Sequence, residues 1–169
     1  ANAALSRVIE SLFDLHCGPT SARLTETGPP MYTLHYAPDN ASLIIRLVLD
    51  GAGIPYRTHL VDRATRQQDS AAYRALNPTG LIPTLETPVG PVSETGAILL
   101  WLSDLHHLGP GPGDPERPAF FKWMFFLSNT AHSELRQIFY PHQYAPADGH
   151  HAHFEIMSTR MKRHFALLD

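Results

Sequence analysis

The sequence predicts a mixed α/β domain followed by an all-helical region. Strand and helix patterns alternate from Met31 to His107, a stretch rich in Gly and Pro interrupts the chain at 110–118, and only helical patterns follow. The 169 residues are 43% hydrophobic and 17% charged, a composition with enough apolar content to bury a core. We therefore expect an α/β domain over 31–109, a linker over 110–118 and the start of an all-helical domain over 119–169.

The first thirty residues differ from the rest of the chain. Apolar residues recur at helical spacing before Asp14, and acidic residues interrupt what would be the apolar part of a secretory signal. We expect residues 1–30 to form an amphipathic helical appendage without chemistry of its own. The alternative is a gene-start artefact, with Met31 beginning the domain proper.

A strand–helix–strand unit opens the α/β domain. Residues 32–36 alternate as a strand does, residues 43–50 are an apolar helix with Ser42 as its expected N-cap, and residues 56–61 form a second strand. If the helix is a crossover, these two strands run parallel.

The residues that follow predict a short helix, two strands, a longer helix and, beyond the linker, two long helices. The short helix covers residues 70–76, the strands cover 83–87 and 91–93, and a strong helix covers 94–107. Beyond the linker, long helices are expected over the ranges 119–140 and 152–168. The order of elements before the linker is typical of a thioredoxin-like layer.

Charge and composition exclude several classes of function. The net charge of −3 lacks the basic footprint of a nucleic-acid-binding protein, and no apolar run is long enough to span a bilayer, so neither nucleic acid nor a membrane is an expected partner. Cys17 is the single cysteine, so no internal disulfide or Cys-x-x-Cys pair can form, and we expect a cytoplasmic protein. The run from His150 to His153 has no carboxylate or cysteine at ligand spacing, so no metal site is predicted.

Several motifs together resemble those of the glutathione S-transferase family. They are Asn77-Pro78-x-Gly80-x-Ile82-Pro83, Glu94-Thr95-x-Ala97-Ile98, the Tyr36-x-Pro38 turn, and Trp123-x-x-Phe126-Leu127 followed by His132. The last of these is similar to the long helix of the bacterial beta-class branch. The resemblance covers residues 31–169, and the later helices of the family's second domain are not found in this sequence.

This resemblance implies a glutathione-binding site. The bond before Pro83 is expected to be cis, which would expose the backbone N–H and C=O of Ile82 to the cysteinyl unit. Glu94 and Thr95, at a helix start, would bind the ammonium and carboxylate of the γ-glutamyl unit. A plain capping arrangement with Ser93 as the cap is the alternative, and both can hold together.

The sequence offers fewer side chains that could bind the glycine carboxylate of glutathione. Leu81 stands where the family often has a charged or amide side chain, so it can offer only its backbone. Gln68 stands where some relatives place a polar contact to that carboxylate, and an ordinary loop glutamine is the alternative. We therefore expect weak glutathione binding.

The residue that activates the glutathione thiol is left open. A free thiol is mostly protonated at neutral pH, so the family stabilises its thiolate with a helix N-terminus and a donor. Asn40 is the first candidate, Ser42 the second and Tyr36 a weaker one, while His132 would approach from the second domain. Ala41 replaces the cysteine of beta-class relatives, which excludes their mixed-disulfide chemistry.

The predicted function is a glutathione-dependent transferase of the detoxification type, acting on a small apolar electrophile. Aromatic residues surround the helix that begins near Ala119, so a homodimer is expected. The alternative is a non-catalytic glutathione transferase-like binding or regulatory module.

Overall fold

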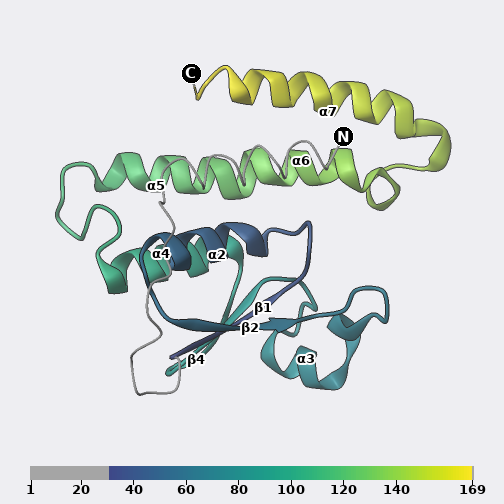
Figure 1. Ribbon diagram of the computed structural model, residues 1–169. Helices are drawn as coiled ribbons and strands as arrows, with labels where there is room; N and C mark the ends of the chain where they lie inside the picture. Colours follow the sequence, from purple (N-terminus) through teal and green to yellow (C-terminus); the bar gives the residue numbers. More distant parts are fainter. Residues whose placement is uncertain (1–30, 169) are drawn as a thin grey trace, which may run out of the picture.

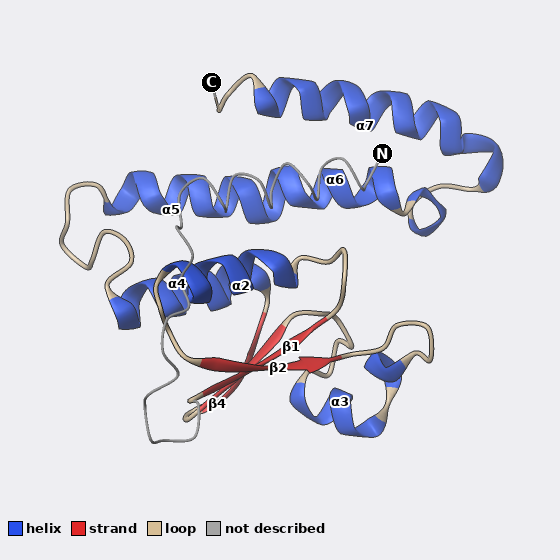
Figure 2. Cartoon of the chain, in the orientation of Figure 1, coloured by secondary structure: helices blue, strands red, loops and turns tan. Residues whose placement is uncertain are grey.

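A four-stranded mixed sheet forms the centre of the first half of the molecule (Figures 1 and 2). The computed structural model describes residues 31–168, so the appendage predicted for residues 1–30 lies outside the described part of the chain. The sheet order is β2-β1-β3-β4, with β1 and β2 parallel and the other neighbouring pairs antiparallel. The strands span Tyr32–Tyr36 (β1), Tyr56–Leu60 (β2), Thr84–Thr87 (β3) and Gly90–Ser93 (β4). The parallel pairing predicted for the first two strands is confirmed.

Within residues 31–168, three helices cover this sheet. Helices α2 (Ser42–Gly51) and α4 (Thr95–His106) lie on one face, and the short α3 (Ala71–Leu76) lies on the other (Figures 1 and 2). The core between the sheet and the helix pair is apolar and closed to solvent. Its members at 0% exposure are Leu34, Ile45, Leu49, Leu85, Ile98 and Leu102. Burying each such side chain contributes roughly 1.5–3 kcal/mol, which anchors both helix starts to the sheet.

The second half is helical, as predicted, but its first helix is not uniform. Helix α5 (Arg117–Phe125) continues through a π-helical segment (Phe126–Ala131) into α6 (His132–Phe139). The run begins two residues before the predicted start, because Pro118 fits in the first helical turn. Backbone N–H groups in that turn have no intrahelical acceptor, so a residue without an N–H loses no hydrogen bond there. Helix α7 (His150–Phe165) then runs back along α6.

The α5–α6 run lies across α2 and α4, and α7 lies on its far side (Figure 1). Arg117 connects the two halves, since its guanidinium donates to the carboxylate of Asp104 in α4 and to the carbonyl of Pro110. No helix within residues 31–168 combines the length and the apolar character needed to cross a membrane.

Candidate functional site

Strand pairing gathers three loops at one edge of the sheet. His35 pairs with Thr84 between β1 and β3, and Thr84 pairs with Ser93 between β3 and β4. The residues directly beyond these positions are therefore neighbours. They are the loop after Tyr36, the Ile82–Pro83 segment before β3, and Glu94 after β4.

The Ile82–Pro83 peptide bond is cis, as the sequence predicted. The preceding carbonyl, that of Leu81, accepts one hydrogen bond from the Tyr73 hydroxyl at 2.7 Å and one from the Asn77 side-chain amide at 2.8 Å. Tyr73 and Asn77 are both buried, so this support is protected from water. Among the described residues, the Ile82 backbone makes no hydrogen bond to another backbone group, which leaves its N–H and C=O for a ligand.

Gln68 lies beside the same loop. Gly80 has φ +68, and a Cβ at this position would lie 3.1 Å from the Gln68 carbonyl oxygen, so both the conformation and the close approach favour glycine. The side-chain oxygen of Gln68 is buried and has no hydrogen-bond partner within residues 31–168. Leu81, which follows Gly80 in the chain, is 48% exposed. The structure thus brings together the two residues predicted for the glycine end of glutathione.

Glu94 and Thr95 stand at the start of α4. Glu94 is the N-cap residue and has φ 68 and ψ 116, a conformation that residues other than glycine rarely adopt. No side chain caps this helix, so the alternative that Ser93 caps it is wrong. The exposed Glu94 carboxylate makes no hydrogen bond or ion pair in the described part of the chain, and α4 begins with backbone N–H groups that have no intrahelical partner. Non-glycine residues held in such strained conformations cluster at functional sites.

Asn40 and Ser42 lie in the turn before α2, and their hydrogen bonds differ from the predicted N-cap arrangement. The Ser42 hydroxyl donates to the Ala37 carbonyl at 3.2 Å and accepts from the Ala37 N–H at 3.4 Å, and only 1% of the residue is exposed. Ser42 is the first residue of α2 and does not cap it, so the predicted N-cap is wrong. The Asn40 side-chain oxygen instead accepts from the Ser42 N–H at 3.0 Å. This bond between residues two positions apart is an Asx turn, which takes the place of the predicted cap. The Asn40 N–H₂ group remains free to donate.

Tyr36 and His132 are less well placed than Asn40 to act on a glutathione thiol. Tyr36 packs against the core, and the Arg46 guanidinium lies 5.5 Å from its ring centroid. His132 begins α6, and within residues 31–168 it has no hydrogen bond, ion pair or ring contact with the first-domain residues of the site. Although His132 keeps an exposed surface, partial burial and the charge of Arg136 lower its pKa. Both causes favour the neutral form of this side chain.

Arg63 was not predicted from the sequence. Its guanidinium donates to the Pro38 carbonyl at 2.8 Å and so connects the loop after β2 to the loop that carries Asn40. Nothing in the local sequence marks an exposed loop arginine, because its partner lies 25 residues earlier. Tyr73 was also missed, although its regular helical position and the nearby Asn77 motif could have indicated a supporting residue.

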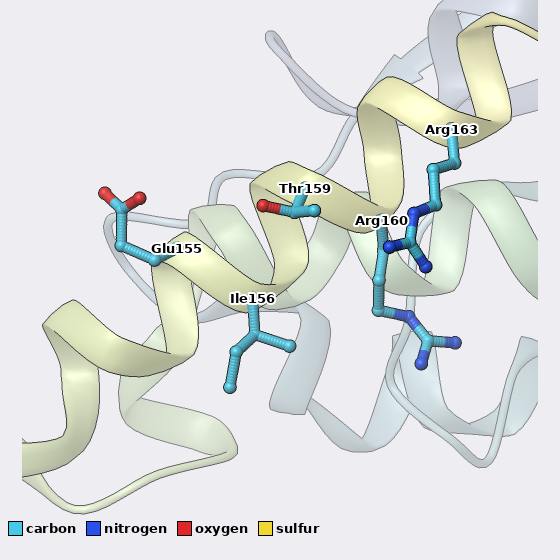
Figure 3. Close-up of a pocket in the computed structure, with 5 residues that line it drawn as sticks. All are labelled: Glu155, Ile156, Thr159, Arg160 and Arg163. Atoms are coloured by element: carbon cyan, nitrogen blue, oxygen red, sulfur yellow. The ribbon is translucent and has the colours of Figure 1, made fainter.

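An open groove of about 430 Å³ lies elsewhere on the molecule. It is lined only by α7, through Glu155, Ile156, Thr159, Arg160 and Arg163 (Figure 3). The α5–α6 run separates α7 from the sheet, so this groove is not part of the site described above (Figure 1). Within residues 31–168 no group of three or more side chains could hold a metal ion.

Comparisons with known proteins agree with this architecture. Residues 41–105 match the family model of the glutathione S-transferase N-terminal domain. A curated glutathione S-transferase of Xanthomonas campestris pv. campestris is 28% identical over 109 residues, which cover 63% of this chain and 52% of the relative. The chain thus spans about half the length of that relative.

Solved structures show the same fold. A theta-class glutathione S-transferase of Xanthomonas axonopodis pv. citri, with glutathione bound, has a TM-score of 0.69 at 26% identity over 83% of this chain and 69% of that one. A glutathione transferase homologue from Sulfitobacter, also with bound glutathione, has a TM-score of 0.64 at 27% identity over 83% and 67%. A Phanerochaete chrysosporium glutathione transferase has a TM-score of 0.75 at 19% identity over 85% and 68%, which shows the fold alone.

Residues 41–105 therefore match the glutathione S-transferase N-terminal domain, and the predicted resemblance of the chain to this family is confirmed. Its placement in the bacterial beta-class branch remains a prediction.

Proposed function

We propose that this protein is a glutathione-dependent transferase, which activates the glutathione thiol for attack on an apolar electrophile. The observation that supports this proposal is the pairing of His35 with Thr84 and of Thr84 with Ser93, which brings the loop after β1, the segment before β3 and the residue after β4 to one edge of the sheet. Glutathione bound to similar folds supports the ligand assignment.

In this proposal each loop binds one part of glutathione. The backbone of Ile82 pairs with the cysteinyl unit as an added strand would. The free N–H groups at the start of α4 and the Thr95 hydroxyl bind the γ-glutamyl carboxylate, and the unpaired Glu94 carboxylate binds the ammonium. Gln68 and the Leu81 backbone meet the glycine end. Because no cationic side chain of the loop serves the glycine carboxylate, affinity is weak.

The thiol is activated by Asn40 and by the start of α2. The side-chain oxygen of Asn40 is fixed by the Ser42 N–H, so its N–H₂ group is oriented and can donate to the thiolate. The positive end of the α2 dipole contributes about 0.3–1 kcal/mol more. Ser42 is excluded from this role because its hydroxyl proton is already given to Ala37.

The reaction is a nucleophilic substitution or addition. The thiol proton is lost to water, and the thiolate sulfur forms a bond to an electrophilic carbon. In a substitution the leaving group departs with its electron pair, and in an addition the π bond of the electrophile breaks and the resulting carbanion takes a proton from water. Leu43 and Ile44, directly after the activating turn, are 43% and 42% exposed. An apolar surface beside the thiol favours an apolar electrophile, of the kind that detoxifying transferases conjugate.

The assembly and location belong to the same proposal. We propose a homodimer, because the α5–α6 run has large apolar side chains that the rest of the described chain leaves exposed. We also propose a cytoplasmic location, since the reaction needs reduced glutathione. The unit over 31–109 would bind glutathione, and the region after the 110–118 linker would supply part of the electrophile pocket.

A panel of electrophiles tests this proposal. Conjugation should depend on glutathione and fall at least tenfold in Glu94→Gln, which removes the charge that meets the ammonium but retains the shape of the side chain. Glu155→Gln, an exposed carboxylate of α7, is the matched control. If the protein binds glutathione but conjugates no member of the panel, the non-catalytic binding or regulatory module is the better reading.

A further inference from the structure

A polar stretch interrupts the apolar α5–α6 run where the run crosses α4. Ser128, Asn129 and Thr130 follow a segment rich in Phe and Trp, and all three lie in the π-helical segment Phe126–Ala131. A π turn inserts an extra residue and rotates the helix surface, and such turns are frequent at functional sites. These polar side chains therefore face a different direction from the apolar residues before them.

Ser128 is the residue of this stretch that reaches the first domain. A Cβ added to Gly96 would lie 3.2 Å from both the Cβ and the Oγ of Ser128, so the two chain segments touch at this point. Gly96 directly follows Thr95 in the first turn of α4. The Ser128 hydroxyl therefore borders the proposed γ-glutamyl end of the site.

The hydrogen bonding of Ser128 indicates which ligand group it can meet. Its Oγ donates to the Asn129 side-chain oxygen at 3.1 Å, so the hydroxyl proton is in use. Within the described residues no donor binds the lone pairs of this oxygen. An oxygen in this state accepts hydrogen bonds, and a carboxylate could not pair with it because a carboxylate has no proton to give.

We propose that Ser128 is a specificity-determining residue that accepts a hydrogen bond from the γ-glutamyl ammonium of glutathione. This inference rests on the proposed function, because it adds a contact from the second region to that glutathione site. Glu94 would meet the same ammonium from the first domain. The absence of a side chain at Gly96 is what allows Ser128 to approach.

Calorimetry with S-methylglutathione, which cannot react, tests the contact. Ser128→Ala should raise the Kd roughly tenfold, the scale of one hydrogen bond to a charged group. Ser133→Ala, an exposed serine in the first turn of α6, should leave the Kd unchanged. In steady-state kinetics the Ser128 variant should raise the KM for glutathione and change kcat by less than about twofold, because the contact is made equally in the ground and transition states.

The N-acetyl derivative of S-methylglutathione separates a direct contact from a structural effect. This ligand has no ammonium, so Ser128→Ala should not change its Kd if the contact is direct. An equal loss of affinity for both ligands would overturn the proposal, and so would no loss for either. If the unsubstituted protein binds neither ligand at millimolar concentration, the proposed function fails as well.

Discussion

At the scale of single residues, the turn before α2 separates two roles that lie only two positions apart. The Asn40 side-chain oxygen accepts a hydrogen bond from the Ser42 N–H, which holds the side chain in place. The Ser42 hydroxyl donates to the Ala37 carbonyl and accepts from the Ala37 N–H. One residue thus keeps a free donor, and the other is part of the buried scaffold.

Asn40→Asp separates the catalytic role of this residue from its structural role. The variant keeps an oxygen for the Ser42 N–H, loses the N–H₂ donor and places a negative charge beside the thiolate. The transferase rate should fall about 10²-fold or more, the scale seen when one preorganised donor is removed, while thermal stability stays close to that of the parent.

Ser42→Ala is the complementary change. It removes two hydrogen bonds in a buried position and should lower the free energy of unfolding by about 1–3 kcal/mol, with a smaller effect on rate. Thermal unfolding and initial rates of both variants check these expectations. A larger rate loss in Ser42→Ala than in Asn40→Asp would reverse the assignment of the activator.

Tyr73 supports the site from a distance. Tyr73→Phe removes the hydroxyl that donates to Leu81, so the loop before Pro83 keeps only the bond from Asn77. The KM for glutathione should rise several-fold, and stability should fall by about 0.5–1.5 kcal/mol. Tyr140→Phe, whose hydroxyl makes no hydrogen bond within residues 31–168, is the control for kinetics and unfolding. An unchanged KM in Tyr73→Phe would show that the loop holds its position without this bond.

The sequence predicts candidate site residues more readily than the hydrogen bonds that these residues make. Ile82, Pro83, Glu94 and Gln68 are candidate site residues because of the resemblance to glutathione S-transferases, and their contacts with glutathione stay predictions. The hydrogen bond that the Asn40 side-chain oxygen accepts depends on the backbone conformation after β1, and the sequence does not reveal that conformation. The positive φ of Glu94 has no sequence signal either, because glycine is the residue that usually marks it.

At the scale of elements, α7 is held to α6 by a nearly buried carboxylate. Glu134 is 6% exposed and accepts from the Arg160 guanidinium and from the His164 ring, the latter at 2.7 Å. The His164 ring also meets Phe126 of the π-helical segment edge-on, at 5.3 Å between centroids. Hydrogen bonds from Arg160, and to a lesser degree from His164, lower the pKa of the Glu134 carboxyl group despite its burial.

This cluster predicts a pH-dependent stability. Because the folded-state pKa of Glu134 is lowered, its contribution is present above the unfolded-state value near 4.5 and is lost as the pH falls through the folded-state value. At pH 7, Glu134→Gln should lower the Tm by about 2–4 °C, the shift for about 1 kcal/mol in a chain of this size. The difference from the parent should shrink below about pH 4.5. Glu155→Gln should shift the Tm little, and a difference that stayed constant with pH would contradict the ionic role.

The order and type of the elements followed from sequence patterns, whereas one interruption did not. Alternation in 32–36 and the apolar period in 43–50 predicted β1 and α2 because both elements bury one face against the core. The π-helical segment could not be predicted, since residues 126–131 continue a helical pattern and the extra residue depends on packing against α4 and α7. The ends of α7 were also misplaced, because few of its residues are buried and its pattern is weak.

At the scale of the whole molecule, the helical half exposes large apolar side chains. Trp123, Phe125 and Leu127 of the α5–α6 run are 37%, 52% and 46% exposed. Sedimentation at micromolar concentration should show a homodimer, since exposed apolar surface of this extent marks interfaces. Phe125→Lys should shift the equilibrium toward monomer, and Val89→Lys, on a hairpin turn and 82% exposed, is the control. A monomeric parent protein would contradict the proposed assembly.

The central claim is that this molecule binds glutathione and holds its thiol as a thiolate. The apparent pKa of protein-bound glutathione, followed by thiolate absorbance across a pH titration, tests that claim most directly. We expect a pKa clearly below the value of about 8.5 for a free thiol, moved back toward that value in Asn40→Asp. A bound thiol that titrates as it does free in solution would contradict the claim.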